Sequence, residues 1–591
     1  MHRVRFATLT LLIAAACGGG KGGGGTGGAG GAGAGGGGSG TAGSGATGGV
    51  PSGLLDPARS TTWNPGILSD EQMHMPLGAD GLPVRTTVCA SPAPGADLNA
   101  AINACPEGQV VKLAAGTYTV SSTIKLNKGV VLRGAGSHAG GTTIVKTGGS
   151  TVIQIGDSLD QACYASNYGT AVALADDAVK ETTTIHVASG GSGFVAGDLA
   201  LVDEVDDAVV QEGDCQYFKR VDKRSVSERV EIASVDAASG TLTLTSPLHW
   251  TFRAAAPHSA QIAKASGAIV HWAGIEGVAL QGGTNPSYDG AMAGGIDISN
   301  AANCWIKDVQ TDGTIGGMHV SLTGTFRVVV RDSHFHNSAN YGFGADCYGI
   351  VLRCGAADNL IENNIARYMN KPIMFNVSGG GNVVAYNYAD NSWATPAAWQ
   401  EVNIDTHCAF PHMELMEGNY APHMGASITH GNAGYMTYFR NYASSQFAPP
   451  AVAGSTDNQT GNISALQFDT GDIDMTVIGN VLGSATATSL GTAPVSASYA
   501  GYSSDTPCIF ELGGSTDVSS TSLIAHGNYD TVTAGVMWSP SIVTHTLPAS
   551  LFLTAKPAWW PSASPWPWAG SDLSPMVGTL PAKARSDSLG P

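Results

Sequence analysis

Aspartate and histidine side chains gather in one stretch of a sequence that has few ionisable residues. Asp405 and His407 lie two positions apart, and His412, His423 and His430 follow shortly after. Charged residues make up only 13% of the chain, so this density is unusual. A carboxylate can act as acid or base on a glycosidic bond, and an imidazole can abstract a proton next to a carboxylate. We therefore expect the catalytic centre in this stretch.

A recurring Asn at the end of short apolar strands indicates how these residues are positioned. It appears in IENNIARY, VVAYNYAD, LMEGNYAP, TYFRNYAS, TVIGNVLG and IAHGNYDT. Such self-similarity is typical of a solenoid built from successive coils. We expect each Asn to adopt the left-handed conformation at a tight bend and its amide to stack on the next. The predicted ladder is Asn364, Asn387, Asn419, Asn441, Asn480 and Asn528, preceded by Asp308 and Asp332.

Each coil also needs a strand upstream of its ladder position, at a distance between 11 residues (Asp308 back to Asp297) and 18 residues (Asn364 back to Asp346). The expected strands are 295–299, 317–321, 342–346, 372–377, 402–407, 427–430 and 465–469. Alternate side chains of a strand point to opposite faces, and neighbouring strands lie about 4.8 Å apart. The outward residues then form one Asp/His stripe: Asp297, His319, Asp346, Asn376, Asp405, His407 and Asp469, with His430 at the end of its strand.

The stripe predicts acid/base chemistry on a polymer that crosses several coils. We assign catalysis to Asp405, His407, His430, Asp346 and His319, with Arg440 as a further candidate one coil later, and substrate binding to Asp297, Asn376 and Asp469. A structural role, as a hydrogen-bonded cap at a coil corner, is the alternative for each of them. Asp405 and four histidines could also supply mixed metal ligands, but no HExxH spacing is present, so no residue is assigned to a metal.

The segment 97–137 resembles a known family. An amphipathic helix at 97–104 is expected to precede short strands. The sequence motifs AINAC, LAAGTYTV and GVVLRGAG are similar to the N-terminal part of the pectate-lyase-like right-handed parallel β-helix superfamily, which includes rhamnogalacturonases and epimerases. The resemblance implies an all-β right-handed parallel β-helix with an N-terminal capping helix, a carbohydrate substrate, and Ca²⁺ as a cofactor that the stripe could hold. The paired-Asp and Gly-His-Gly motifs of polygalacturonase-type hydrolases are absent, so no mechanism transfers residue by residue.

The sequence divides into segments of different composition. We expect an export signal at 1–17, a Gly-rich flexible tether at 18–55, the N-terminal cap and first coils at 85–165, a β-rich insertion at 166–265, the main β-helix at 266–545 and a Pro/Trp-rich C-terminal cap and tail at 546–591. The insertion is either structural or a wall beside the substrate groove. Cys89 with Cys105 and Cys347 with Cys354 are close enough in sequence to form disulfides.

The N-terminus predicts export. Arg3 and Arg5 precede a short apolar run that ends at Cys17, which resembles a bacterial lipoprotein signal; simple secretion after Ala16 is the alternative. The expected location is thus the bacterial cell surface or outer membrane through a lipid on Cys17, or the extracellular space. The net charge of −18 argues against nucleic-acid binding, and a monomer is expected.

The leading hypothesis is a surface-tethered or secreted enzyme that degrades a polysaccharide by β-elimination. A glycoside hydrolase of the same fold, a non-catalytic carbohydrate-binding adhesin and a uronate epimerase are the alternatives. Only the fold supports the carbohydrate part, because one fold can host many functions.

Overall fold

The computed structural model describes residues 50–589 except 69–75, 158–162, 189–192, 214–218, 285–292, 340, 342–347, 393–399, 428, 447–461, 486–494 and 502–505. Gly45–Pro591 forms one compact unit. Cys17, the export signal, most of the tether and Asp346 lie outside the described residues. Within the described part, no helix is both long and apolar enough to cross a membrane.

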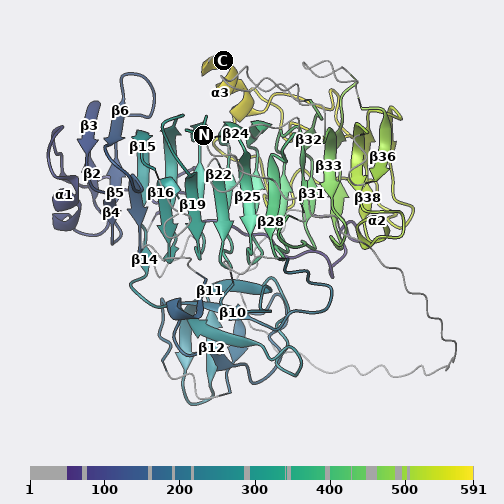
Figure 1. Ribbon diagram of the computed structural model, residues 1–591, viewed down its shortest axis with the longest axis horizontal. Helices are drawn as coiled ribbons and strands as arrows, with labels where there is room; N and C mark the ends of the chain where they lie inside the picture. Colours follow the sequence, from purple (N-terminus) through teal and green to yellow (C-terminus); the bar gives the residue numbers. More distant parts are fainter. Residues whose placement is uncertain are drawn as a thin grey trace, which may run out of the picture. The chain divides into compact units, whose positions relative to one another are not determined.

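The fold is a parallel β-helix, in which each coil contributes strands to stacked parallel sheets (Figure 1). One sheet has 11 strands and carries the predicted stripe. In spatial order its strands are β4 (Ile124–Leu126), β7 (Ile153–Ile155), β16 (Ala293–Ser299), β19 (Met318–Thr323), β22 (Tyr348–Arg353), β25 (Lys371–Asn376), β28 (Ile404–Cys408), β30 (Met424–Ala426), β33 (Ser464–Phe468), β37 (Cys508–Leu512) and β36 (Ala497–Gly501). The expected all-β parallel helix is confirmed.

A 17-stranded sheet forms the other sides of the coils. One run of parallel strands is β1 (Val88–Ala90), β2 (Val110–Lys112), β5 (Val131–Arg133), β15 (Gly274–Gly282), β18 (Trp305–Thr311), β20 (Val329–Arg331), β23 (Leu360–Glu362), β26 (Val383–Ala385), β29 (Leu415–Glu417), β31 (Thr437–Phe439), β34 (Thr476–Ile478) and β38 (Ile524–His526). A second run, joined to the first through the long strands β15 and β18, is β3 (Gly116–Val120), β6 (Thr142–Lys146), β21 (His334–His336), β24 (Ile365–Met369) and β27 (Tyr388–Ser392).

Alternating apolar residues fill the interior of the coils, as the sequence pattern predicts. Ile296 and Ile298 pair in register with Val320 and Leu322 of the next strand, and all four side chains are buried in one continuous core. At the N-terminal end, helix α1 (Leu98–Ala104) packs against β4 and adds Leu98 and Ile102 to this core. Asp97 begins the helix by accepting a hydrogen bond from the Ala100 amide.

The Asn ladder is present but differs from the prediction in two respects. Each ladder amide donates to the side-chain oxygen of the next, with nitrogen–oxygen distances of 2.9–3.1 Å from Asn364 to Asn528. The left-handed conformation belongs to the residue before each ladder position, for example Asn363 with φ 55°. Asp332 likewise has a left-handed conformation, with φ 56°, so it is the residue before a ladder position. The ladder position of that coil is Ser333, whose backbone N–H donates to Asn364 Oδ1.

Replacing Asn419 by alanine should lower the free energy of unfolding by about 1–3 kcal/mol, because buried polar groups on both neighbouring coils lose their hydrogen-bond partner. Asn419 donates to Val384 O and Asn441 Oδ1 and accepts from Asn387. Denaturant unfolding measures the change, and the exposed Asn127→Ala is the matched control. Equal stability of the two variants would show that the ladder is dispensable.

The insertion is an antiparallel sheet with its own apolar core. Its strands are β8 (Val172–Ala173), β13 (Gln261–Lys264), β10 (Leu199–Asp203), β11 (Ser227–Asp236), β12 (Thr241–Leu244) and β9 (Thr184–His186). It is attached to turns that follow strands of the 11-stranded sheet, through the hydrogen bond from Arg229 N to Gly355 O and the 3.0 Å pair of His249 with Asp358. The Cys163–Cys354 disulfide ties the segment before the insertion to the same turn, so the expected Cys347–Cys354 pairing is wrong, whereas Cys89–Cys105 is confirmed.

The C-terminal segment packs along the side of the coils and also contacts the last coil, where Ser571 Oγ donates to Gly527 O. Trp560 and Trp568 pack beside Tyr386, Leu415 and Phe439 on the flank of the 17-stranded sheet, and helix α3 (Pro581–Leu589) lies against β24. The apolar tail stabilises the flank because it buries aromatic surface there.

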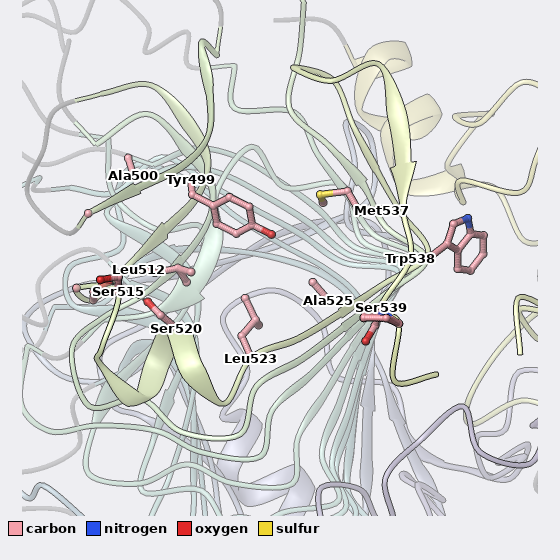
Figure 2. Close-up of a pocket in the computed structure, with 14 residues that line it drawn as sticks. Tyr499, Ala500, Leu512, Ser515, Ser520, Leu523, Ala525, Met537, Trp538 and Ser539 are labelled. Atoms are coloured by element: carbon pink, nitrogen blue, oxygen red, sulfur yellow. Dashed lines mark hydrogen bonds between the residues drawn. The ribbon is translucent and has the colours of Figure 1, made fainter. Parts of the chain in front are cut away.

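The last coil has a hollow of about 640 Å³ between β36 (Ala497–Gly501), the short helix α2 (Val518–Thr521) and β40 (Gly535–Met537). Figure 2 shows Tyr499, Leu523, Ala525 and Met537 around this hollow, with the Trp538 ring turned away from it. That ring stacks on His545 at 4.0 Å.

Candidate functional site

The structure places two stripe strands differently from the sequence pattern. The strand expected at 342–346 is β22, which begins at Tyr348, so Val351 and Arg353 take the outward positions of that coil. The strand expected at 427–430 is β30, which ends at Ala426. His430 therefore lies in the turn after the strand and not on the sheet itself.

The outward residues nevertheless share a register across the sheet. Asp297 pairs with Ser321, Ser321 with Val351, Val351 with Met374, and Met374 with Asp405. Four strand spacings of about 4.8 Å separate the two aspartates, or roughly 19 Å. Asp297 and Asp405 thus belong to one row but to different clusters, separated by Ser321, Val351 and Met374.

His407 occupies an irregular position in β28. Phe375 pairs with Thr406, but the next residue of β25, Asn376, pairs with Cys408, so His407 is the extra residue of a β-bulge. A bulge interrupts the alternation of side chains and is common beside active sites, where it re-aims one residue. The His407 side chain is half-buried. Because His407 is the extra residue of the bulge, it is not in the regular row of outward residues.

Asp405 is held in a buried ion pair. It has 0% exposed surface, contacts the ammonium of Lys371, and accepts hydrogen bonds from Ser427 N at 3.0 Å and Ser427 Oγ at 2.8 Å. Glu401 lies 3.3 Å from the same ammonium. Burial alone would lower the pKa of Lys371, but Asp405 and Glu401 raise it above its ordinary value of 10.5. Lys371 is therefore a fixed positive charge.

Two further rings surround the His407 imidazole. The His430 ring meets it edge-on with centroids 4.6 Å apart, and the Tyr348 hydroxyl lies 3.5 Å from His407 Nε2. Burial, with smaller contributions from Lys371 and His430, lowers the pKa of His407 well below 6.5. The imidazole is therefore neutral at neutral pH and can accept a proton. Among the described residues His407 Nδ1 is buried without a hydrogen-bond partner, which leaves Nε2 as the nitrogen that faces Tyr348.

The insertion reaches this group of residues, hereafter the His407 cluster (Tyr348, Lys371, Asp405, His407 and His430). Gln211 and Asn432 exchange two hydrogen bonds, from Gln211 N to Asn432 Oδ1 at 2.7 Å and from Asn432 N to Gln211 O at 3.0 Å. Gly213 lies so close to the His430 backbone that a Cβ there would clash. A loop of the insertion therefore borders the turn that carries His430.

Asp297 forms a second polar group with Arg353, which the sequence analysis did not single out. Burial raises the pKa of Asp297 to about 6, although Arg353 opposes this effect, and burial lowers the pKa of Arg353 to about 10. Arg353 Nε donates to Thr323 Oγ1 at 2.8 Å. Asp297 Oδ2 and Asn376 Oδ1 are buried with no hydrogen-bond partner in the described part of the chain.

Other predicted site residues lie outside the His407 cluster. His319 is buried between Thr311 Oγ1 at 2.6 Å and Ser338 Oγ at 3.2 Å, and burial lowers its pKa to about 3. Arg440 does not belong to the cluster: it directly follows β31 of the other sheet and binds Asp572 of the C-terminal segment at 2.8 and 2.9 Å. Asp469 directly follows β33, the strand next to β30, and accepts a hydrogen bond from the Gln467 side-chain amide at 2.8 Å.

Tyr348 and Lys371 are the members that the sequence analysis missed. Strict alternation assigns both to the interior, because Ile350 and Ile373 two positions later are core residues. Both stand at the first position of their strand, and their contacts nevertheless reach Asp405 and His407. Within the described ranges, no group of three or more His, Cys, Asp or Glu side chains has the arrangement of a metal site.

Comparisons with known proteins identify no family for this chain. No protein-family model and no curated protein matches it. Similar solved structures include the tailspike protein gp49 from Pseudomonas phage LKA1 (15% identity, TM-score 0.38, 71% of this chain and 73% of that chain). An alginate lyase from Paenibacillus sp. str. FPU-7 is also similar (11% identity, TM-score 0.34, 72% of this chain and 98% of that chain). So is PfbA, a surface adhesin of Streptococcus pneumoniae (12% identity, TM-score 0.30, 65% of this chain and 82% of that chain). At these identities and TM-scores, the similarity carries no argument about activity.

Proposed function

We propose that the protein is a polysaccharide lyase that cleaves a uronate-containing chain by β-elimination at the His407 cluster. The observation that carries this proposal is a neutral, half-buried imidazole placed on a bulge beside a phenol and a fixed ammonium. Elimination needs a base for the proton next to the carboxylate, an acid for the departing oxygen, and positive charge near the developing enolate.

Each requirement has a residue in the cluster. His407 Nε2 takes the proton from the carbon next to the uronate carboxylate, and the electron pair forms a carbon–carbon double bond as the glycosidic carbon–oxygen bond breaks. The Tyr348 hydroxyl donates a proton to the departing oxygen, and its 3.5 Å distance from Nε2 places the acid and the base side by side on one side of the substrate. Lys371 stabilises the developing negative charge at a distance, and Asp405 positions Lys371.

The parallel β-helix supports a polymeric substrate. Asp297, Arg353 and Asn376 lie along the same sheet as the His407 cluster, so successive sugar units of an extended chain would meet successive coils. The positive charge of Arg353 favours a second uronate carboxylate near this part of the sheet, although the side chains of Arg353, Asp297 and Asn376 are themselves buried. From the N-terminal sequence we further propose that the enzyme is exported and tethered through Cys17.

A glycoside hydrolase is the second candidate function, because Glu401 and Asp405 both contact Lys371 and so lie close together. Paired carboxylates are the usual machinery of glycoside hydrolysis. Product analysis separates the two. A new ultraviolet-absorbing unsaturated end group means elimination, whereas new reducing ends without it mean hydrolysis. Saccharide binding with neither product would favour the adhesin hypothesis, and altered uronate stereochemistry in an intact chain would favour the epimerase hypothesis.

The pH dependence of kcat/KM provides a further prediction. A general base works in its neutral form, so activity is lost as the pH falls through the pKa of the base in the folded enzyme. The pKa of His407 lies well below 6.5, so the acidic limb of the profile should also lie well below pH 6.5. A steady-state profile between acidic and neutral pH measures this limb. A limb centred at or above pH 6.5 would exclude His407 as the base in the environment described here.

A further inference from the structure

A small polar hollow lies on the 17-stranded sheet, on a different face of the coils from the His407 cluster. Its volume is about 170 Å³, and its lining includes the polar side chains of His138, Gln281, Gln310 and Asp312. Gln281 and Gln310 come from β15 and β18, and Asp312 follows β18 directly. His138 belongs to the turn at 134–141 between β5 and β6. Thr311, between Gln310 and Asp312, is fully buried, so its two neighbours point outward by alternation.

The turn at 134–141 is held in place by hydrogen bonds and close backbone packing. Ser137 Oγ donates to Asp308 Oδ1 at 2.6 Å, and Thr142 Oγ1 accepts from Ala135 N at 2.8 Å. A Cβ on Gly134 or Gly141 would clash with the backbone, so the close packing of the turn requires glycine at both ends. The hollow is therefore shaped before any ligand arrives, which lowers the entropic cost of binding.

Hydrogen bonds connect the polar side chains across coils. The Gln310 carbonyl can only accept, so His138 Nδ1 donates to it at 3.3 Å, and the Gln310 amide donates to His336 Nε2 at 3.1 Å. His336 stacks on His334 with ring centroids 4.2 Å apart. The Gln281 amide donates to Asp312 Oδ2 at 2.9 Å. Strand pairing of Gln310 with His334 sets successive groups about 4.8 Å apart.

The chemistry of this array favours hydroxyl groups. Amide and imidazole groups both donate and accept hydrogen bonds, as saccharide hydroxyls do. Burial lowers the pKa of His336, so its ring adds no positive charge at neutral pH. Asp312 contributes a carboxyl group to the lining and no Lys or Arg side chain lines the hollow in the described part of the chain, so a neutral ligand fits it better than an anionic one. The volume lies below that of typical drug-sized pockets and suits a single ring.

We propose that this hollow binds one ring of a neutral saccharide, separately from the proposed uronate-cleaving site. Such a site would hold the protein on a polysaccharide that contains neutral units. The proposal concerns other residues and another ligand class, so it does not depend on the proposed lyase activity.

Isothermal titration in a His407→Ala background tests the proposal without turnover. The probes are neutral hexasaccharides of glucose, xylose, mannose and galactose, with a galacturonate hexamer for comparison. We expect at least one neutral probe to bind, and the variant His138→Ala/Gln310→Ala to weaken that binding about tenfold or more, because two hydrogen-bonding groups of the lining are lost. The control Gln109→Ala/His186→Ala removes the same residue types at other surface positions and should bind as before.

Two results would overturn the proposal. One is the absence of binding by every neutral probe, and the other is neutral-probe binding that is equal in the variant and the control. If the double variant loses thermal stability, His138→Ala provides the same test, because His138 is exposed and its replacement removes no core contact. Unchanged neutral-probe binding in that variant would likewise contradict the proposal.

Discussion

Replacing His407 by alanine is expected to lower kcat about 10²–10⁴-fold, the usual contribution of a general base. The imidazole is half-buried, lies on a bulge, and has a pKa well below 6.5, so it is neutral and available at neutral pH. Stability should change little, because its hydrogen bond to Tyr348 is long and its Nδ1 has no partner among the described residues. Initial rates and a thermal melt of the same preparation measure both effects.

The exposed His186→Ala is the control for the loss of an imidazole elsewhere on the surface. Activity within a factor of about two of wild type in both variants would refute the role of His407. A His407→Ala variant that melts far below the control would instead assign the residue a structural role.

Replacing Asp405 by alanine is expected to destabilise the fold by about 3–5 kcal/mol, because it leaves the buried Lys371 ammonium without its main partner. The alternation pattern alone predicts the opposite: an outward residue on a strand holds no core, so its loss should leave unfolding nearly unchanged. The structure changes this expectation because Asp405 has no exposed surface and three donors. Denaturant unfolding of the variant measures the loss.

The double variant Asp405→Leu/Lys371→Met provides the matched comparison, because it removes both charges together. It should recover most of the stability, since a buried ion pair contributes little over apolar residues of similar size. A free energy of unfolding for Asp405→Ala within about 0.5 kcal/mol of wild type, the range of neutral surface substitutions, would show that the pair is not buried as described.

The repeating parts of the fold could be predicted from the sequence. Apolar alternation identified the interior of the coils, and the recurring Asn identified the bends, because both patterns repeat with each coil. Where a coil departs from the common spacing, the prediction failed. The 18-residue distance from Asn364 back to Asp346 was the longest in the series, and in that coil the strand begins at Tyr348, two residues after Asp346. A shorter distance would have selected the apolar run at 350–352.

The candidate site could be predicted only in part. Asp405 and His407 were found because they stand in a dense ionisable stretch. Tyr348 and Lys371 were missed because alternation assigns their side chains to the interior. Each is the first residue of its strand, where the alternation of side chains between the two faces has not begun. The bulge at His407 is set by pairing with a neighbouring coil, which no local pattern contains.

Contacts between distant segments account for the remaining differences. Arg440 follows the His-rich stretch closely in sequence, but its guanidinium is bound by Asp572, which comes from the C-terminal segment. The insertion loop that borders His430 is more than 200 residues upstream, as the Gln211–Asn432 separation of 221 residues shows. Such pairings depend on how the coils and their appendages pack, and composition and spacing do not reveal them.

The most direct test is the product formed from a galacturonate- or mannuronate-containing polysaccharide by wild type and His407→Ala. Chromatography with ultraviolet detection, together with a reducing-end assay, distinguishes the possible reactions. We predict that wild type forms an unsaturated, ultraviolet-absorbing end group with each new reducing end, and that His407→Ala forms neither at a comparable rate. New reducing ends without the unsaturated group, or unsaturated product formed equally by both proteins, would contradict β-elimination at His407.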